Sequence, residues 1–198
     1  VVRSMKDIEA NLRLSGDNNA ALWIHSQAEN DEMEEVHAEL NQIDLGIISN
    51  AFSYIPPMKG ILNADFQYAP SDSAFMVVAD MNIDDLYYEN ERVGELMFNA
   101  VYLPLEQGNH QVDMHLFRDR KEVSAITALY QMGETDHISG TVEFMHFPLD
   151  IANPFIPDDM AKMGGDLDGT LAISGQSDKP MAEGYLILDT ASVYVGAA

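Results

Sequence analysis

The sequence contains no cysteine. Disulfide scaffolds, thiol nucleophiles and cysteine-based zinc sites are therefore excluded. Basic residues are scarce as well, because 10 Lys and Arg stand against 33 Asp and Glu and give a net charge of -23. A chain this acidic repels phosphate backbones and anionic lipid headgroups, so neither nucleic acid nor broad adsorption to a membrane surface is expected.

Long apolar runs are also missing. No run approaches the roughly 20 residues that span a bilayer, and no basic and then apolar leader follows Val1. The hydrophobic share of 46% is nevertheless enough for a sizeable buried layer. We expect residues 1–198 to form a single β-rich domain that is a segment of a longer protein, with any signal or anchor outside it.

One stretch near the start of the chain returns near its end. The pattern Gly-x-Leu-x-small-x-apolar occurs at 60–66 and again at 165–171, an offset of 105 residues. At the same offset, residues 79–84 align with 184–189. A fixed period predicts a repeated supersecondary unit whose copies stack and share one apolar layer. The repeat covers approximately residues 43–88 and 147–195.

Clusters of turn-forming residues occur at short intervals along the chain, and apolar residues alternate with polar ones between them. Leu62, Ala64 and Phe66 alternate with Asn63, Asp65 and Gln67, for example. Short alternating strands joined by tight turns predict an all-β, elongated, mostly antiparallel meander with one covered and one wet face. A second sheet could cover the apolar face as a sandwich; otherwise the sheet must curl around a ligand or another protein.

Two segments break the alternation. Residues 47–54 and 153–163 precede the two Gly-x-Leu motifs, and both are predicted to be short helices over the apolar face. Gly164-Gly165 is interpreted as the stop of the second helix. Residues 34–41 also fit helical spacing, but the surrounding hairpins favour a strand there.

Candidate catalytic and metal-binding residues do not form a constellation. His110, Asp113 and His115 lie in one strand without a matching metal-ligand motif. Asp80, Asn82 and Asp84 begin like a calcium loop, but Asp85 replaces the required glycine. Nucleophile motifs are absent from the sequence. We therefore expect no enzyme, no metal and no cofactor.

The repeat resembles those of the TamB and AsmA-like family. The resemblance rests on Ile43-Asp44-Leu45 through Gly60-Ile61-Leu62-Asn63-Ala64, and on Gly165-x-Leu167-x-Gly169-x-Leu171-x-Ile173-Ser174-Gly175 with Gly184 opening the next strand. The first copy departs from the pattern, since Ala64 replaces the second glycine. The resemblance implies a "β-taco", a folded sheet with an apolar groove. It also implies a periplasmic location with an inner-membrane anchor outside this chain, phospholipid transport, and assembly of outer-membrane proteins with a TamA-like barrel partner.

The expected function is that of a non-enzymatic conduit whose groove carries phospholipid acyl chains toward the outer membrane. The residues expected to line the groove are Leu62, Ala64, Phe66, Phe75, Val77, Met81, Ile83, Leu96, Phe98, Val112, Met114, Leu116, Val142, Phe144, Leu167, Leu171, Ile173, Leu186 and Leu188. Two alternatives remain: a chaperone-like scaffold that pairs with strands of nascent outer-membrane proteins, and a closed β-sandwich used for binding or adhesion.

Overall fold

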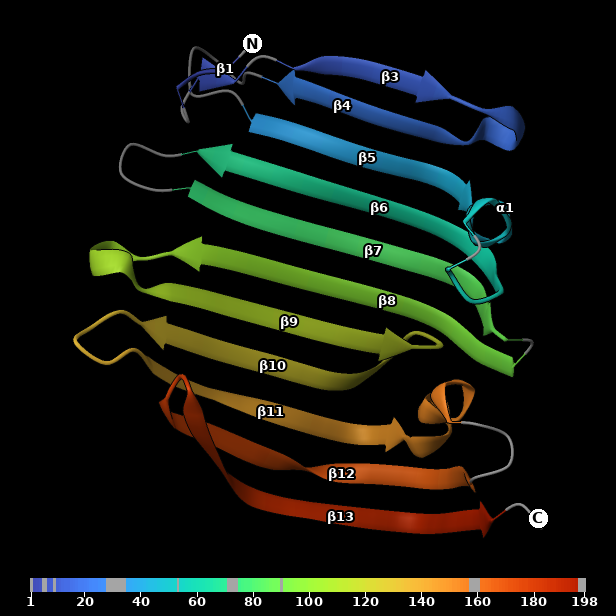
Figure 1. Cartoon of the computed structure of the whole chain (residues 1–198), viewed down its shortest axis with the longest axis vertical. Helices are drawn as coiled ribbons and strands as arrows, with labels where there is room; N and C mark the ends of the chain where they lie inside the picture. The colour runs from blue at the N-terminus through green and yellow to red at the C-terminus, as the bar shows by residue number, and fades with distance from the viewer. Residues whose placement is uncertain are drawn as a thin grey trace.

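The chain folds into one large open sheet (Figure 1). The structure is a computed structural model that describes residues 2–4, 7–8, 10–27, 35–52, 54–70, 75–89, 91–156 and 161–195. Eleven strands pair in strict chain order from β3 to β13, and all of these pairings are antiparallel. The predicted all-β meander is therefore confirmed.

The strands of the large sheet are between 5 and 17 residues long. The large sheet consists of β3 (Asn11–Ser15), β4 (Ala21–Gln27), β5 (Glu35–Asp44), β6 (Met58–Pro70), β7 (Phe75–Tyr88), β8 (Glu91–Pro104), β9 (His110–Arg118), β10 (Lys121–Gln131), β11 (His137–Pro148), β12 (Ala161–Gln176) and β13 (Lys179–Val195). A separate two-stranded sheet pairs β1 (Val2–Ser4) with β2 (Asp7–Ile8). The helical segments are η1 (Asp17–Asn19), α1 (Leu45–Ala51), η2 (Glu106–Gly108) and η3 (Leu149–Phe155).

The first predicted helix, 47–54, is α1, which begins two residues and ends three residues earlier than expected. It begins at Leu45 because the Asp44 carboxylate accepts a hydrogen bond from the Gly46 amide at 2.8 Å and caps the helix. The segment predicted as a strand over 34–41 is β5, although residue 34 lies outside the described residues.

The second predicted helix, 153–163, is wrong in its bounds. The helical segment is η3, and Ala161–Met163 already belongs to β12, whereas 157–160 lie outside the described residues. Asn153 does not start the helix; it ties η3 to β12. Its side chain donates to the Met163 carbonyl at 2.8 Å and accepts from the Met163 amide at 2.7 Å.

The large sheet has no covering layer among the described residues. Their buried apolar side chains are only Leu45, Ala64, Val93 and Val123. The solvent-accessible surface is 12784 Å², whereas a compact protein of 22.0 kDa would expose about 9,300 Å². The closed β-sandwich alternative is therefore wrong, because it requires a second sheet over the first.

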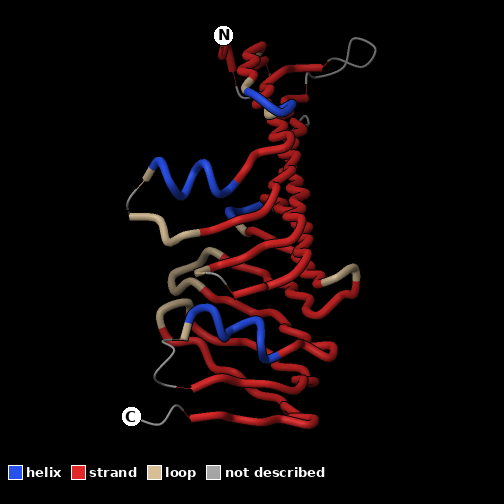
Figure 2. Tube along the Cα trace, turned by 90° about the vertical axis from the view of Figure 1, so that its right-hand side faces the viewer, coloured by secondary structure: helices blue, strands red, loops and turns tan. Residues whose placement is uncertain are grey.

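Bulges bend the sheet near the strand ends that lie beside α1 and η3. Register shifts interrupt six strand pairs of the large sheet there. The bulged residues Gln42, Asp85, His146 and Thr190 have φ between 47° and 52°. A bulge adds a residue to one strand, bends that strand and increases its twist. The sheet in Figure 2 accordingly curls, and α1 and η3 lie on the same side of it.

The two segments predicted to repeat, 43–88 and 147–195, share these local features. The pairs Leu62–Ile83 and Leu167–Leu188 occupy the same register at an offset of 105. Ser49 in α1 bonds to both backbone groups of Met58, at 3.3 Å each, as Asn153 does to Met163. In each segment a polar side chain thus fastens the helix to the strand that follows it.

The fourth residue of each Gly-x-Leu motif caps a bulge. Asn63 Oδ1 accepts from the Gln42 amide at 2.9 Å, and Asp168 Oδ1 accepts from the His146 amide at 2.7 Å. Both amides belong to residues with positive φ, which lie outside the regular ladder. The motif therefore requires a short side chain with an acceptor oxygen at this position.

We expect Asp168→Ala to destabilise the fold by about 1 kcal/mol, because the His146 amide loses its acceptor. Asp168→Asn retains the oxygen, as Asn63 does, and is expected to cost much less. Urea unfolding of both variants tests this role. Equal losses for the two variants would show that the charge of Asp168, rather than its hydrogen bond, matters.

The apolar face as candidate functional site

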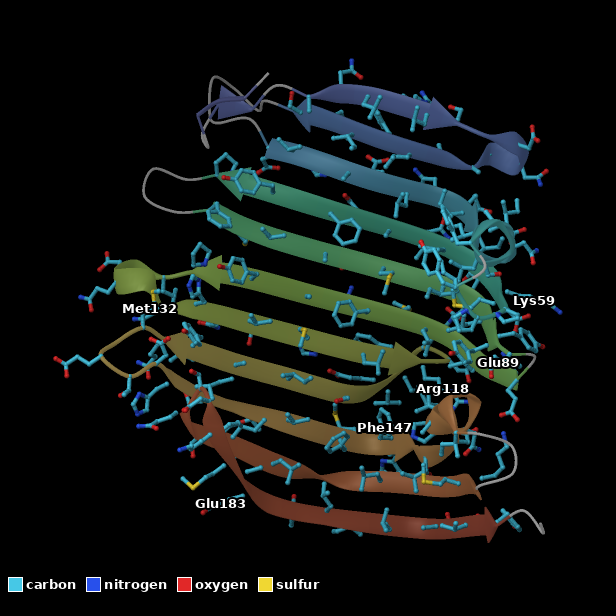
Figure 3. All side chains as sticks on the ribbon, viewed as in Figure 1. Lys59, Glu89, Arg118, Met132, Phe147 and Glu183 are labelled. Atoms are coloured by element: carbon cyan, nitrogen blue, oxygen red, sulfur yellow. The ribbon has the colours of Figure 1, made fainter. Side chains whose placement is uncertain are left out.

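The strand register places all nineteen residues expected to line a groove on one face of the sheet. The pairs Phe66–Ala79, Ala100–Met114 and Val142–Leu171 exemplify this arrangement. Side chains that are directly opposite in an antiparallel pair share a face, and so do residues two apart in a strand. We call this surface the apolar face. Figure 3 shows Phe147 of β11 at this surface. Its ring packs edge-on against the ring of Phe144, with the two ring centroids 5.7 Å apart.

A row of apolar or small residues crosses the apolar face without interruption. It contains one residue from each of the eleven strands: Leu12, Ile24, Ala38, Phe66, Ala79, Ala100, Met114, Ile126, Val142, Leu171 and Gly184. Strands in a sheet lie about 4.8 Å apart, so the row is about 48 Å long. It runs across the strands, so a long apolar ligand could follow it without meeting a charge. We call it the central row.

Seven members of this row were absent from the expected site residues. They are Leu12, Ile24, Ala38, Ala79, Ala100, Ile126 and Gly184. The alternation of Val36, Ala38 and Leu40 was a usable signal for β5, as was that of Ile126 and Ala128 for β10. Alternation shows only which residues of one strand share a face, so the register between strands was needed to align all eleven in one row.

Large side chains of the apolar face remain in contact with water. Phe66 is 41% exposed, Leu186 49% and Leu188 62%. Fully burying a side chain of this kind is worth about 1.5–3 kcal/mol. These side chains stay partly exposed in the folded chain. An apolar ligand or partner that covers the face therefore gains free energy by burying them.

Charged side chains border the apolar face at the end of the strands where η3 lies. Arg118 follows Leu116 on the same face, and its guanidinium makes a two-pronged ion pair with the Asp150 carboxylate in η3. Lys162 of β12 pairs with Glu91 of β8 at 2.5 Å. Figure 3 shows Arg118 beside η3. The first pair holds η3 at this end of the strands, and the second joins β12 to β8.

Hollows in the surface lie away from the central row. A cavity of about 760 Å³ at the η3 edge is lined by residues of both charges, including Arg118, Lys121, Asp150 and Asp166. A shallower hollow of about 390 Å³ lies on the opposite, polar face beside Asp65, Asp80 and Asn99. Neither hollow combines an apolar lining with a few convergent polar groups, which is typical of a small-molecule site.

The polar face carries a row of like charges. Glu39, Asp65 and Asp80 lie directly opposite one another on β5, β6 and β7. Like charges in adjacent cross-strand positions destabilise a sheet. Asp80 accepts a hydrogen bond from Asn99, and Asp65 lies 3.4 Å from His37 Nδ1, so only part of the repulsion is relieved.

We expect Asp80→Asn to stabilise the fold by about 0.5 kcal/mol, because it removes the charge at the end of this row, which lies directly opposite Asp65. The gain should shrink in high salt, which screens exposed charges. Urea unfolding in low and high salt tests it. A loss of stability in both conditions would mean that the Asp80–Asn99 hydrogen bond outweighs the repulsion.

The described part of the chain has neither a candidate membrane span nor a candidate metal centre. No helix there is both long and apolar enough to cross a bilayer. Three or more His, Cys, Asp or Glu side chains arranged to hold a metal ion were not found in the same residues. The apolar face is thus the feature of the described structure that best fits a functional site.

The structure defines a class of protein: an open, curled β-meander with a continuous apolar face and no layer over it in the described residues. The chain matches the family described as "TamB, N-terminal domain" over residues 15–188. It belongs to the TamB family. Comparison with curated proteins and with solved structures gave no significant match.

Membership in this family fixes the general role. TamB-family proteins are non-enzymatic, span the periplasm and act in assembly of the outer membrane or in lipid transport. The family is associated with the outer-membrane assembly machinery. The predicted family is therefore confirmed, and its general role agrees with the absence of a catalytic motif in the sequence.

Proposed function

We propose that the apolar face forms a groove that binds phospholipid acyl chains and carries them toward the outer membrane. The observation that carries this proposal is the row of eleven apolar or small residues that crosses every strand of the large sheet. The nineteen residues expected from the sequence, together with the added members of this row, line the groove.

The energetics of such a groove favour movement of the ligand. Each buried CH₂ contributes about 0.8 kcal/mol, so two acyl chains are held without polar contacts. Hydrophobic burial has no preferred direction, and a chain that slides along the row exchanges similar contacts for one another. The acidic exterior, with a net charge of -23, keeps the protein soluble while the groove is loaded.

In this proposal the chain is one β-rich domain of a longer protein that is anchored in the inner membrane by a segment outside residues 1–198. A TamA-like barrel in the outer membrane is the partner at the far end. The net charge of -23 makes nucleic acid an unfavourable partner on electrostatic grounds.

Lipid binding by the purified chain tests the proposal. The chain is incubated with phospholipid vesicles, separated from them and extracted, and the bound lipid is measured by mass spectrometry. We expect bound phospholipid that a fluorescent fatty acid displaces. If the separated protein carries no lipid and the fluorescent fatty acid does not bind, the proposal is wrong.

A second candidate function is pairing with strands of nascent outer-membrane proteins, for which β13, the last strand of the large sheet within residues 1–198, offers an edge. Leu186, Ile187 and Leu188 are 49%, 56% and 62% exposed, so consecutive residues on both faces of this strand contact water. An exposed strand edge offers backbone donors and acceptors to an added strand. A photo-crosslinker at Ile187 that captures unfolded barrel protein, with no lipid bound to the chain, would favour this function over transport.

A further inference from the structure

Aromatic rings line the end of the apolar face opposite α1 and η3. Tyr68, Phe75, Tyr102, His110 and Tyr130 belong to β6 through β10, and the register places all five on the apolar face. Successive ring centroids lie 5.3, 5.9, 5.8 and 5.8 Å apart. We call this row of rings the aromatic rim. All five side chains are half-buried, so part of each ring contacts water.

The rim has polar groups on its outer side. Tyr130 Oη donates a hydrogen bond to the Asp136 carboxylate at 2.5 Å, and Tyr102 Oη lies 2.8 Å from His110 Nδ1. The Tyr130 hydroxyl, with the Gly133 amide, lowers the pKa of Asp136 below its ordinary value. The carboxylate is therefore ionised at neutral pH. Tyrosine rings with apolar bodies and polar tips are typical of boundaries between hydrocarbon and water.

Basic residues are distributed unevenly between the two ends of the apolar face. The described turns beyond the rim, 105–109, 132–136 and 176–179, contain Glu106, Glu134, Asp136 and Asp178 against Lys179 as their single cation. Most of the described cations lie at the opposite end, where Arg92, Arg118, Arg120 and Lys162 pair with Asp85, Asp150, Glu95 and Glu91. The rim thus combines aromatic faces with acidic groups and favours a positively charged ligand group.

We propose that the aromatic rim binds a lipid headgroup that carries an ammonium group, while the acyl chains lie along the apolar face. This inference rests on the proposed lipid-binding groove and adds the orientation and the headgroup class of the ligand. An ammonium over an aromatic face gains about two- to fivefold in affinity at an exposed site, and the Asp136 carboxylate adds an attraction of the same sign. A headgroup with only negative charge meets repulsion at the same place.

A competition between two headgroups tests the proposal. The purified chain is incubated with vesicles of equal parts dioleoyl phosphatidylethanolamine and dioleoyl phosphatidylglycerol, which have identical acyl chains. After separation, mass spectrometry gives the ratio of the two bound lipids. We expect about a threefold excess of the ethanolamine lipid over its share of the vesicles.

Variants separate the rim from the general acidity of the protein. Asp136→Asn, and independently Tyr130→Leu, should bring the ratio down to that of the vesicles. Glu134→Gln removes one charge from the same turn outside the rim and should leave the ratio unchanged. The ratio does not depend on how much lipid each variant binds, so a partial loss of binding does not obscure it.

Two results would overturn the inference. In the first, the wild-type protein takes up the two lipids in the proportions of the vesicles. In the second, Asp136→Asn and Glu134→Gln lower the ratio equally, which would assign the preference to net charge. Absence of any bound lipid is a different result, because it rejects the groove itself.

Discussion

Val142→Glu is expected to weaken lipid binding at least about tenfold, which corresponds to about 1.4 kcal/mol. Val142 is the β11 member of the central row, and its cross-strand neighbours are Ile126 and Leu171. A bound acyl chain would strip water from the glutamate, and a carboxylate without a partner in an apolar environment is costly. In the empty groove the carboxylate remains hydrated, so the variant is expected to fold. Titration with a fluorescent fatty acid measures the loss.

Thr141→Glu is the matched control for this experiment. Thr141 precedes Val142 in β11 but lies on the polar face, and its neighbours Thr127 and Ala172 are uncharged. The control adds the same charge one residue away and should bind lipid as the wild type does. Equal binding by Val142→Glu and Thr141→Glu would show that ligand does not occupy the apolar face at β11.

Gly165→Ala is expected to destabilise the fold by about 3 kcal/mol. Gly165 has φ of 95° at the bulge between β12 and β13, a conformation that side chains with a Cβ rarely adopt. A Cβ there would lie 2.6 Å from the Asp189 carbonyl oxygen and 2.7 Å from the Ala191 backbone. Strained φ and backbone overlap each cost about 1–3 kcal/mol. The urea midpoint gives the size of the loss.

The preceding glycine provides the control, because Gly164 has no positive φ. A Cβ at Gly164 meets only the Ser192 hydroxyl, at 3.0 Å, which belongs to a side chain that can rotate away. Gly164→Ala is therefore expected to change the urea midpoint little. If both substitutions cost the same, the bulge at Gly165 does not constrain the sheet, and another feature must produce its curl.

Alternation made the apolar face predictable in advance. Residues such as Leu62, Ala64 and Phe66 had to share a face in any strand, because successive side chains point to opposite sides. The repeat motif likewise indicated corresponding strands at 60–66 and 165–171. These features depend on local periodicity, which needs no knowledge of tertiary contacts.

The bulges were not predictable, and they changed the interpretation of two glycines. Gln42, Asp85 and His146 adopt positive φ without the glycine signal that would identify such positions. Gly164-Gly165 was interpreted as a helix stop, but both residues lie inside β12, and Gly165 faces the bulge at Thr190. Acceptors from a neighbouring strand stabilise some of these conformations: Asn63 bonds to Gln42, and Asp168 bonds to His146. Such pairings are long-range and have no local signature.

The amino-acid sequence by itself determined the succession of strands and turns, the apolar and polar faces, the acidic surface and the family. Only the tertiary structure decided that the apolar face is open, that one row crosses all eleven strands, and that aromatic rings gather at one end of it. The physical reason is that alternation records which side of a strand is apolar. It does not record what packs against that side, because a sandwich and an open curled sheet place the same residues on the same face.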